Sequence, residues 1–139
     1  MRIHHESIEV ATSGRGAIDV GARVQAVVER SGVRTGLCTV FVRHTSAGLL
    51  VQENADPAVL RDLGRWLDEV APESPRWEHD DEGPDDMPAH LRATLLRTSE
   101  SIPIADARLA LGTWQTLYLW EHRRHGRKRT LIINIIGVD

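Results

Sequence analysis

The sequence contains very little cysteine and no long hydrophobic run. A single cysteine, Cys38, excludes an intramolecular disulfide framework and a zinc ribbon built from several cysteines. The longest uncharged apolar run is LIINIIGV, from Leu131 to Val138, which is far too short to span a bilayer. The first ten residues contain no apolar segment of the kind that a secretory signal needs. These absences predict a soluble protein of the reducing cytoplasm.

Several common catalytic motifs are also absent. The chain has no GxxxxGKS or GxGxxG motif, so a P-loop or a Rossmann dinucleotide site is not expected. It has no GxSxG elbow, which argues against a serine hydrolase of that type. It has neither an HExxH motif nor a CxxC pair, so any metal site must use a different set of ligands.

The length and the residue pattern predict one α+β domain over residues 1–139. Hydrophobic residues make up 41% and charged residues 27% of the chain, which is typical of a globular protein. Apolar periodicity predicts a mostly antiparallel, sandwich-like sheet core with about three helices. The expected helices span residues 19–30, 57–70 and 89–98, and the expected strands span residues 3–10, 36–43, 47–54, 101–104, 114–121 and 130–138.

Three details of that pattern are specific enough to test. Asp56 and Pro57 form a strong helix start, because Asp caps a helix and Pro suits its first position. The apolar strand at residues 36–43 is expected to be buried on both faces. The basic, glycine-containing segment 122–129 is expected to join the last two strands as an antiparallel hairpin.

The net charge of −3 conceals two segments of opposite sign. Residues 78–86 carry six acids, and residues 122–129 carry five bases. An acidic loop can bind a cation and a basic loop can bind phosphate. The balance as a whole does not indicate a nucleic-acid-binding protein, which is usually basic over a whole face.

Four of the seven histidines lie at the ends of expected elements, where binding groups tend to be displayed. They are His44, His79, His90 and His122. His79 and His90 flank one loop, which can bring them together if it folds back. With His44 they would form a three-histidine metal site that leaves a position open for water or substrate. The alternative is that these are ordinary hydrogen-bonded histidines.

Polar residues near these histidines are further candidates. Asp80, Glu82 and Asp85 can orient the histidines or hold Mg²⁺ against a pyrophosphate, or they can be a solvated loop that caps the next helix. Thr45 and Ser46 can hydrogen-bond a phosphate or carbonyl oxygen. Elsewhere, Glu53 is a candidate general base or a surface acid, and Trp114 can stack on a heteroaromatic ring or belong to the core. The remaining candidates for substrate binding are Asn54 and Gln115.

Three long motifs resemble the YjbQ-type family, which is also described as secondary thiamine-phosphate synthase. They are HTSAGLLVQENADP from His44, HDDEGPDDMPAH from His79 and LGTWQTLYLWEHR from Leu111. The resemblance implies a compact α+β fold and a homotrimer with sites near the subunit boundaries. It also implies a weak thiamine-phosphate synthase activity, in which an aminopyrimidine methyl diphosphate is joined to a thiazole phosphate and pyrophosphate is released.

The resemblance also implies which residues form the site. By motif, His44, His79 and His90 line a metal or anion pocket, with zinc as the expected metal and Mg²⁺ as the alternative for a diphosphate substrate. Thr45, Ser46, Asp80, Glu82 and Asp85 stand alongside them. His122 and Arg123, from the WEHR sequence, are the expected phosphate partners.

Other functions remain open from the sequence. The same pocket would suit a metal-dependent phosphohydrolase or lyase, which would release free phosphate without forming a new C–N bond. A non-enzymatic protein that binds a phosphorylated metabolite or a metal would bind tightly without turnover. Nucleic-acid binding through residues 122–129 is the weakest alternative, because the nearby acids oppose it.

Overall fold

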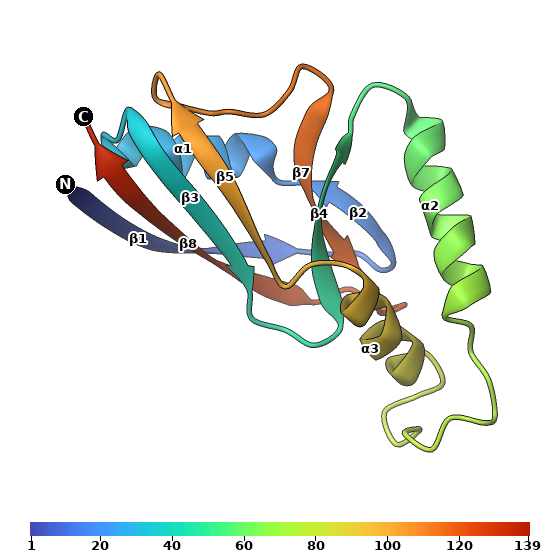
Figure 1. Cartoon of the computed structure of the whole chain (residues 1–139). Helices are drawn as coiled ribbons and strands as arrows, with labels where there is room; N and C mark the ends of the chain where they lie inside the picture. Colours follow the sequence, from blue (N-terminus) through green and yellow to red (C-terminus); the bar gives the residue numbers. More distant parts are fainter.

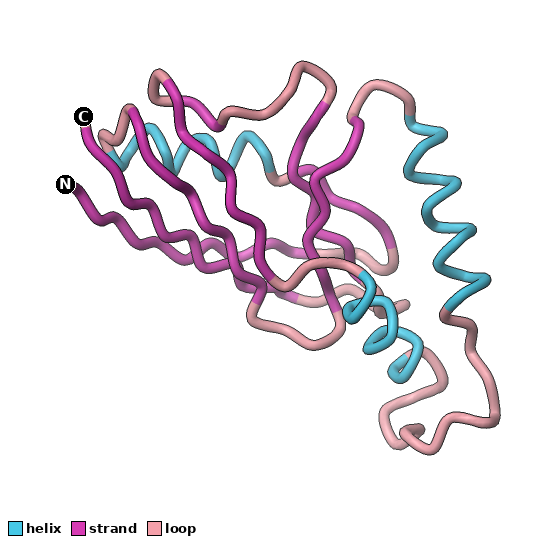
Figure 2. The backbone as a smooth tube through the Cα atoms, viewed as in Figure 1, coloured by secondary structure: helices cyan, strands magenta, loops and turns pink.

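The computed structural model describes all 139 residues, which form three helices and eight strands (Figures 1 and 2). Two of the strands, β2 and β6, are short and were not expected from the sequence. In chain order the elements are β1 (Arg2–Ala11), β2 (Gly16–Asp19), α1 (Gly21–Ser31), β3 (Thr35–Val42), β4 (Ala47–Glu53), α2 (Pro57–Val70), α3 (Asp86–Leu95), β5 (Ser99–Ala105), β6 (Arg108–Leu109), β7 (Gln115–Glu121) and β8 (Lys128–Val138).

The strands form two antiparallel sheets. The larger sheet has the order β1-β8-β3-β5-β6, and the smaller has the order β2-β7-β4. Every strand pairing is antiparallel. Buried side chains of both sheets join those of α1 in one hydrophobic cluster. The predicted α+β class with a mostly antiparallel β core and three helices is therefore confirmed.

Alternation along β8 shows how the sequence determines the inner face of the larger sheet. Leu131, Ile133 and Ile135 are fully buried, whereas Asn134 and Ile136 are exposed. Side chains alternate between the two faces of a strand, so this period of two directs one apolar set into the core. The core side is covered by α1, whose buried valines recur at helical spacing: Val24, Val27 and Val28.

The helix α2 begins where the sequence predicted. The Asp56 carboxylate accepts a hydrogen bond from the Ala58 N–H at 2.9 Å, and Pro57 is the first helical residue. Leu67 is the one buried residue of this helix, although its apolar residues follow a clear stripe. Figure 1 shows α2 standing beside the smaller sheet instead of lying across it. No helix of the structure combines the length and the apolar character that crossing a membrane requires.

Two predictions about the strands were wrong. Segment 122–129 does not close a hairpin, because β7 pairs with β2 and β4 while β8 pairs with β1 and β3. Both strands already have a neighbour on each side, so neither has a free edge for the other. Strand β3 is not buried on both faces, because Leu37 and Phe41 are exposed while Cys38 and Val40 are buried.

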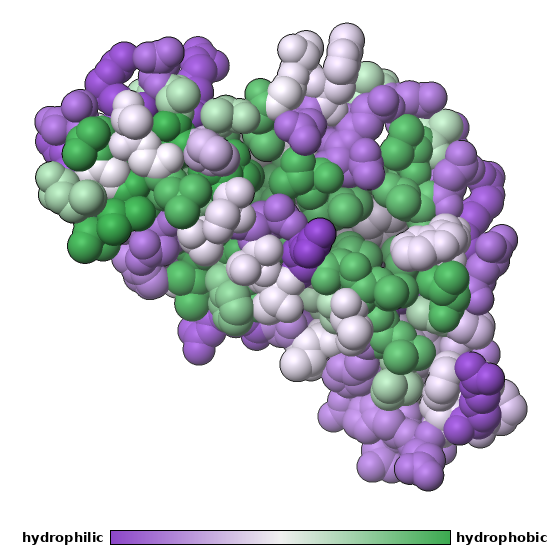
Figure 3. All heavy atoms as spheres, viewed as in Figure 1, coloured by the Kyte–Doolittle hydropathy of each residue, from purple (hydrophilic) through white to green (hydrophobic).

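The outer face of the larger sheet has no covering layer. Ile3 and Leu37 both lie opposite Ile136 in the strand register, and all three side chains are exposed. Figure 3 shows apolar residues gathered over these strands, whereas hydrophilic residues dominate the loop between α2 and α3 at the lower right. That loop carries the acidic segment and leads into α3, which begins at Asp86, three residues before the expected start.

Candidate functional site

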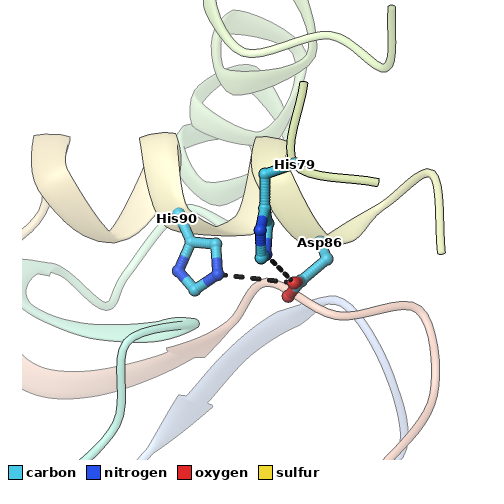
Figure 4. Close-up of side chains that lie close together, drawn as sticks. All are labelled: His79, Asp86 and His90. Atoms are coloured by element: carbon cyan, nitrogen blue, oxygen red, sulfur yellow. Dashed lines mark hydrogen bonds and ion pairs between the residues drawn. The ribbon is translucent and has the colours of Figure 1, made fainter. Parts of the chain in front are cut away.

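The first turn of α3 and the loop before it bring two histidines and one carboxylate together (Figure 4). Asp86 and His90 are four residues apart on α3, so they lie on the same face of the helix. The Asp86 Oδ2 atom lies 3.4 Å from His90 Nε2 and 2.6 Å from His79 Nε2. The two imidazole rings meet edge to face with their centroids 5.2 Å apart.

Neighbouring groups orient two of these three side chains. The His90 Nδ1–H donates to the Thr45 carbonyl oxygen at 2.9 Å, which leaves Nε2 unprotonated when the ring is neutral. The Asp86 Oδ1 atom accepts a hydrogen bond from Arg123 Nη1 at 2.7 Å, which leaves Oδ2 for the histidines. Burial on its own raises the pKa of Asp86, but the hydrogen bond from His79 and the charge of Arg123 outweigh it and lower the pKa. Asp86 therefore stays ionised at neutral pH.

Arg123 joins the acidic and the basic segments within one chain. Its Nε donates to Asp85 Oδ2 at 2.9 Å, and its Nη2 donates to the carbonyl oxygen of Glu82 at 2.7 Å. The Arg124 backbone N–H also donates to Asp85, at 3.0 Å. Burial raises the pKa of Asp85, but these hydrogen bonds hold it well below its usual range. One base of the basic segment, Arg123, thus pairs with two acids of the acidic segment, Asp85 and Asp86.

A second buried ion pair lies at the end of β7. Glu121 is completely buried and pairs with Arg129, and it accepts a hydrogen bond from Thr12 Oγ1 at 2.6 Å. Arg129 Nη2 donates to Ser46 Oγ at 2.9 Å, which ties the start of β4 to β8. Burial raises the pKa of Glu121, but the hydrogen bonds from Arg129 and Thr12 lower it by more. This pair stabilises the strand ends beside the site.

The His79, Asp86 and His90 side chains fit a divalent metal ion. One ligand atom from each residue lies within 4.8 Å of the other two. Tetrahedral zinc, with bonds of about 2.1 Å, places its ligand atoms about 3.4 Å apart, which small side-chain rotations can reach here. Two imidazoles and one carboxylate leave a fourth position for water or substrate. Histidine ligands commonly donate a hydrogen bond from the ring nitrogen that does not face the metal, as His90 does here to Thr45.

The comparisons with known proteins agree on one family. The family model described as "UPF0047 protein YjbQ-like" matches residues 6–138. The chain belongs to the YjbQ-like UPF0047 family. It is 53% identical over 137 residues to the UPF0047 protein sll1880 of Synechocystis, covering 98% of this chain and 93% of that protein. It is 44% identical over 105 residues to the UPF0047 protein YjbQ of Salmonella typhimurium, covering 76% of each.

Solved structures of the family share the fold. A YbjQ-like protein of unknown function from Sulfolobus solfataricus superposes with a TM-score of 0.89 at 27% identity, covering 98% of both chains. An uncharacterised YjbQ/UPF0047 family protein from Clostridium acetobutylicum gives a TM-score of 0.87 at 38% identity, covering 94% of this chain and 99% of that one. The resemblance noted in the three sequence motifs is thus confirmed.

The third histidine expected from the family motifs, His44, lies outside the group of His79, Asp86 and His90. His44 Nε2 accepts a hydrogen bond from the Thr130 backbone N–H at 2.8 Å, so this nitrogen is occupied. Burial, and after it the charge of Arg129, lowers the pKa of His44, so the ring is neutral at pH 7. His44 lines a separate depression of about 540 Å³ with Thr45, Ser46 and Arg129. The structure brings Asp86, and not His44, to His79 and His90.

The two residues expected to bind phosphate are buried. His122 is completely buried, and neither of its ring nitrogens has a hydrogen-bond partner. Burial, and after it the charge of Arg92, lowers the pKa of His122 to about 3, so the ring is uncharged. Arg123 is 6% exposed, and its donors face Asp85, Asp86 and Glu82. In this structure Arg123 holds the site's carboxylates in place.

Four other candidates lie at the opposite end of the smaller sheet. Glu53 and Gln115 pair at the far end of β4 and β7, and the Asn54 N–H donates to the Trp114 carbonyl oxygen at 2.9 Å. Six residue steps along β4 separate Glu53 from Ala47, a distance of about 20 Å. Trp114 is exposed and not part of the core. Within one chain these residues cannot contact a ligand held by His79 and His90.

The candidates from the acidic loop differ in burial. Asp80 and the Glu82 side chain are exposed, whereas Asp85 is buried against Arg123. Asp86, one of the six acids of segment 78–86, is the carboxylate that faces both histidines. Its spacing of four residues from His90 was the available signal. This spacing did not point to Asp86 because the helix was expected to begin at residue 89, three residues after its actual start.

Proposed function

We propose that this protein is a metal-assisted transferase that acts on phosphorylated heteroaromatic substrates, with a weak thiamine-phosphate synthase activity. The observation that supports this proposal is the group of His79, Asp86 and His90, whose ligand atoms converge at one point. The family motifs around His44, His79 and Leu111 suggest the substrate pair. These substrates are an aminopyrimidine methyl diphosphate and a thiazole phosphate.

The proposed reaction is balanced without an oxidant or a reductant. The thiazole nitrogen uses its lone pair to form a bond to the methylene carbon of the pyrimidine. The bond from this carbon to the diphosphate oxygen breaks, and pyrophosphate leaves with the electron pair. The nitrogen is already a nucleophile, so the protein must mainly position the two substrates and stabilise the leaving group.

Different residues of the chain would hold the metal ion, orient its ligands and bind the substrate phosphate. His79, Asp86 and His90 would hold a divalent ion, with zinc favoured by the two imidazoles. A bound ion supplies positive charge where negative charge develops on the leaving diphosphate. The Thr45 carbonyl fixes the His90 ring, and Arg123 fixes the Asp86 carboxylate. The Thr45 side chain is exposed beside His90, where its hydroxyl can donate to a phosphate oxygen.

Metal content tests the proposal most directly. Elemental analysis of the untagged protein should find close to one zinc or other divalent ion per chain. The His79→Ala/His90→Ala variant should lose it, and a His5→Ala/His125→Ala control, which removes two exposed histidines, should keep it. A His44→Ala variant separates the two ligand sets, because the metal should stay bound if Asp86 is the third ligand.

Product analysis then distinguishes the reaction classes. Incubation of the metal-loaded protein with both substrates should yield pyrophosphate and thiamine phosphate in equal amounts. Free phosphate without condensation would instead indicate a phosphohydrolase. Tight binding of either substrate without turnover would indicate a binding protein.

We also propose a homotrimer and a cytoplasmic location. The trimer rests on the family resemblance and is supported by the exposed apolar row of Ile3, Leu37 and Ile136 on the uncovered sheet face. Size-exclusion chromatography with light scattering tests it, and a monomeric mass at micromolar concentration would contradict it. The cytoplasmic location rests on the single cysteine, and fractionation of cells tests it.

A further inference from the structure

A cleft on another side of α3 gathers arginine side chains from three parts of the chain. It has a volume of about 560 Å³ and lies between α2 and the smaller sheet. Arg15 comes from the loop before β2, Arg61 and Arg65 come from α2, and Arg92 comes from α3. Asp68 is the one acid in its lining. Ligand pockets are commonly about 300–1,000 Å³ in volume, so the cleft is large enough for a small organic molecule.

The positive charge of the cleft is only partly neutralised. Arg92 Nη2 pairs with Asp68 at 2.9 Å, and Arg65 pairs with the exposed Asp62 at 2.7 Å. Arg15 and Arg61 form no ion pair. Partial burial, and after it repulsion by the charge of Arg92, lowers the pKa of Arg15, while the acids Glu73 and Asp68 oppose this shift. An anion placed between these side chains would relieve this repulsion.

Two buried guanidinium nitrogens in the cleft lack an acceptor. Arg15 Nε donates to the His122 carbonyl oxygen at 3.1 Å, but its Nη2 has no partner. Arg92 is 3% exposed, and its Nε also has no partner. A buried donor without an acceptor costs about 1–3 kcal/mol, and more when it is charged. Arg15 precedes β2 and Arg92 lies on α3, and both residues belong to the cleft lining.

The cleft wall also contains apolar residues, namely Ala17, Leu60 and Trp120. Trp120 is 5% exposed and belongs to the lining, with Gly64 of α2 facing it. A Cβ atom at Gly64 would lie 3.9 Å from Trp120 Cζ2, an ordinary contact distance, so α2 lies close to Trp120 at this point. The lining thus combines apolar residues with four arginines, which suits an organic molecule that carries a charged group. A planar guanidinium group can donate two parallel hydrogen bonds to two oxygens of one phosphate.

We propose that this cleft binds a small phosphorylated organic molecule, whose phosphate or diphosphate accepts hydrogen bonds from Arg15, Arg92 and Arg61. The site is separate from the group of His79, Asp86 and His90. Arg92 follows His90 by two residues, which places the two side chains about 200° apart around α3. The proposal does not require the transferase activity, and it assigns the chain a second anion site.

Calorimetric titration with pyrophosphate tests the proposal, with a chelator present to remove metal. Wild-type protein should bind one pyrophosphate per chain. The Arg61→Gln/Arg65→Gln variant should bind it at least about tenfold more weakly, because two cations of the lining are lost. Both side chains are exposed, so this variant should fold normally. An Arg23→Gln/Arg108→Gln control removes the same charge from exposed positions outside the cleft and should bind within about twofold of wild type.

Two further variants complete the test. Arg15→Gln should weaken pyrophosphate binding, because the unpartnered Nη2 donor is lost. His79→Ala/His90→Ala should leave it unchanged, and this separates the cleft from the proposed transferase site. Absence of binding by wild type, equal weakening by the control pair, or loss of binding in the histidine variant would each overturn the proposal. Binding of short single-stranded DNA but not of pyrophosphate would also overturn it, in favour of a nucleic-acid surface.

Discussion

Two groups of arginines differ in how their charge is balanced. In the first group, Arg129 faces Glu121, and Arg123 faces both Asp85 and Asp86. All of these side chains are at most 9% exposed. In the second group, which lines the cleft under α2, Arg92 pairs with Asp68 and Arg65 with the exposed Asp62, while Arg15 and Arg61 form no ion pair.

This difference in charge balance distinguishes arginines that hold elements together from arginines that can bind a ligand. A buried cation that already has a carboxylate partner holds elements together, and removing either partner leaves an uncompensated charge. A cation without such a partner is free to bind an anion from solution. Arg123 belongs to the first kind although its sequence motif suggested a phosphate partner, and Arg15 belongs to the second kind although nothing in its sequence context drew attention to it.

The largest effect is expected from breaking the balanced group. Arg129→Met should lower the free energy of unfolding by about 3–5 kcal/mol, because Glu121 is completely buried and would lose its cation. Urea denaturation monitored by circular dichroism measures this change. Arg127→Met, which removes an exposed arginine two residues earlier, should change the stability by less than about 0.5 kcal/mol.

A second variant checks the cause of that loss. The double variant Arg129→Met/Glu121→Gln lacks the unpaired buried carboxylate charge, so it should recover part of the lost stability. If Arg129→Met alone costs less than about 1 kcal/mol, or if the double variant is no more stable, the ion pair does not hold the strand ends together.

A smaller, pH-dependent effect is expected from the buried His122. Its pKa is about 3 in the folded chain and near 6.5 when unfolded, so between these values the unfolded state binds the extra proton. Stability should therefore fall as the pH falls below 6.5, by up to about 1.4 kcal/mol per pH unit from this group.

The His122→Gln variant isolates this contribution. Denaturation series from about pH 7 to about pH 5 should show a shallower pH dependence for the variant than for wild type, in a range above the titration of the carboxylates. His125→Gln, at an exposed histidine of the same segment, serves as the matched control and should keep the wild-type slope. An unchanged slope in His122→Gln would show that the ring is not held neutral.

The smallest effect on stability is expected in the cleft. Arg61→Gln/Arg65→Gln removes exposed charges and one surface ion pair, so the free energy of unfolding should change by less than about 1 kcal/mol. Thermal denaturation in chelator measures this, with and without pyrophosphate. Pyrophosphate should raise the melting temperature of wild type and not of the variant. A large loss of stability without ligand would place these arginines with the structural group instead.

The elements themselves could be predicted from local patterns. The apolar stretch at residues 130–138 predicted the strand that became β8, and Asp56 with Pro57 predicted the start of α2. The candidate histidines His79 and His90 were also found, because two histidines flanking a loop can meet when it folds back. These features depend on side-chain periodicity and capping, which act over a few residues.

Which elements meet could not be predicted in the same way. The basic segment looked like a hairpin turn, but β7 and β8 enter different sheets because each is already paired on both sides. His44 faces the Thr130 N–H instead of His90, and Glu53 lies at the opposite end of β4. Such outcomes depend on strand order and register, which no short window of sequence contains.

The sequence by itself therefore determined the α+β class, most of the elements and the residue types available for chemistry. The tertiary structure decided that Asp86 joins His79 and His90, that Arg123 neutralises the acids behind them, and that Arg15 and Arg92 share a cleft with α2. The physical reason is the distance along the chain over which each effect acts. Propensity and periodicity are local, whereas a ligand group or a charge balance depends on side chains brought together from distant parts of the chain by packing around one core.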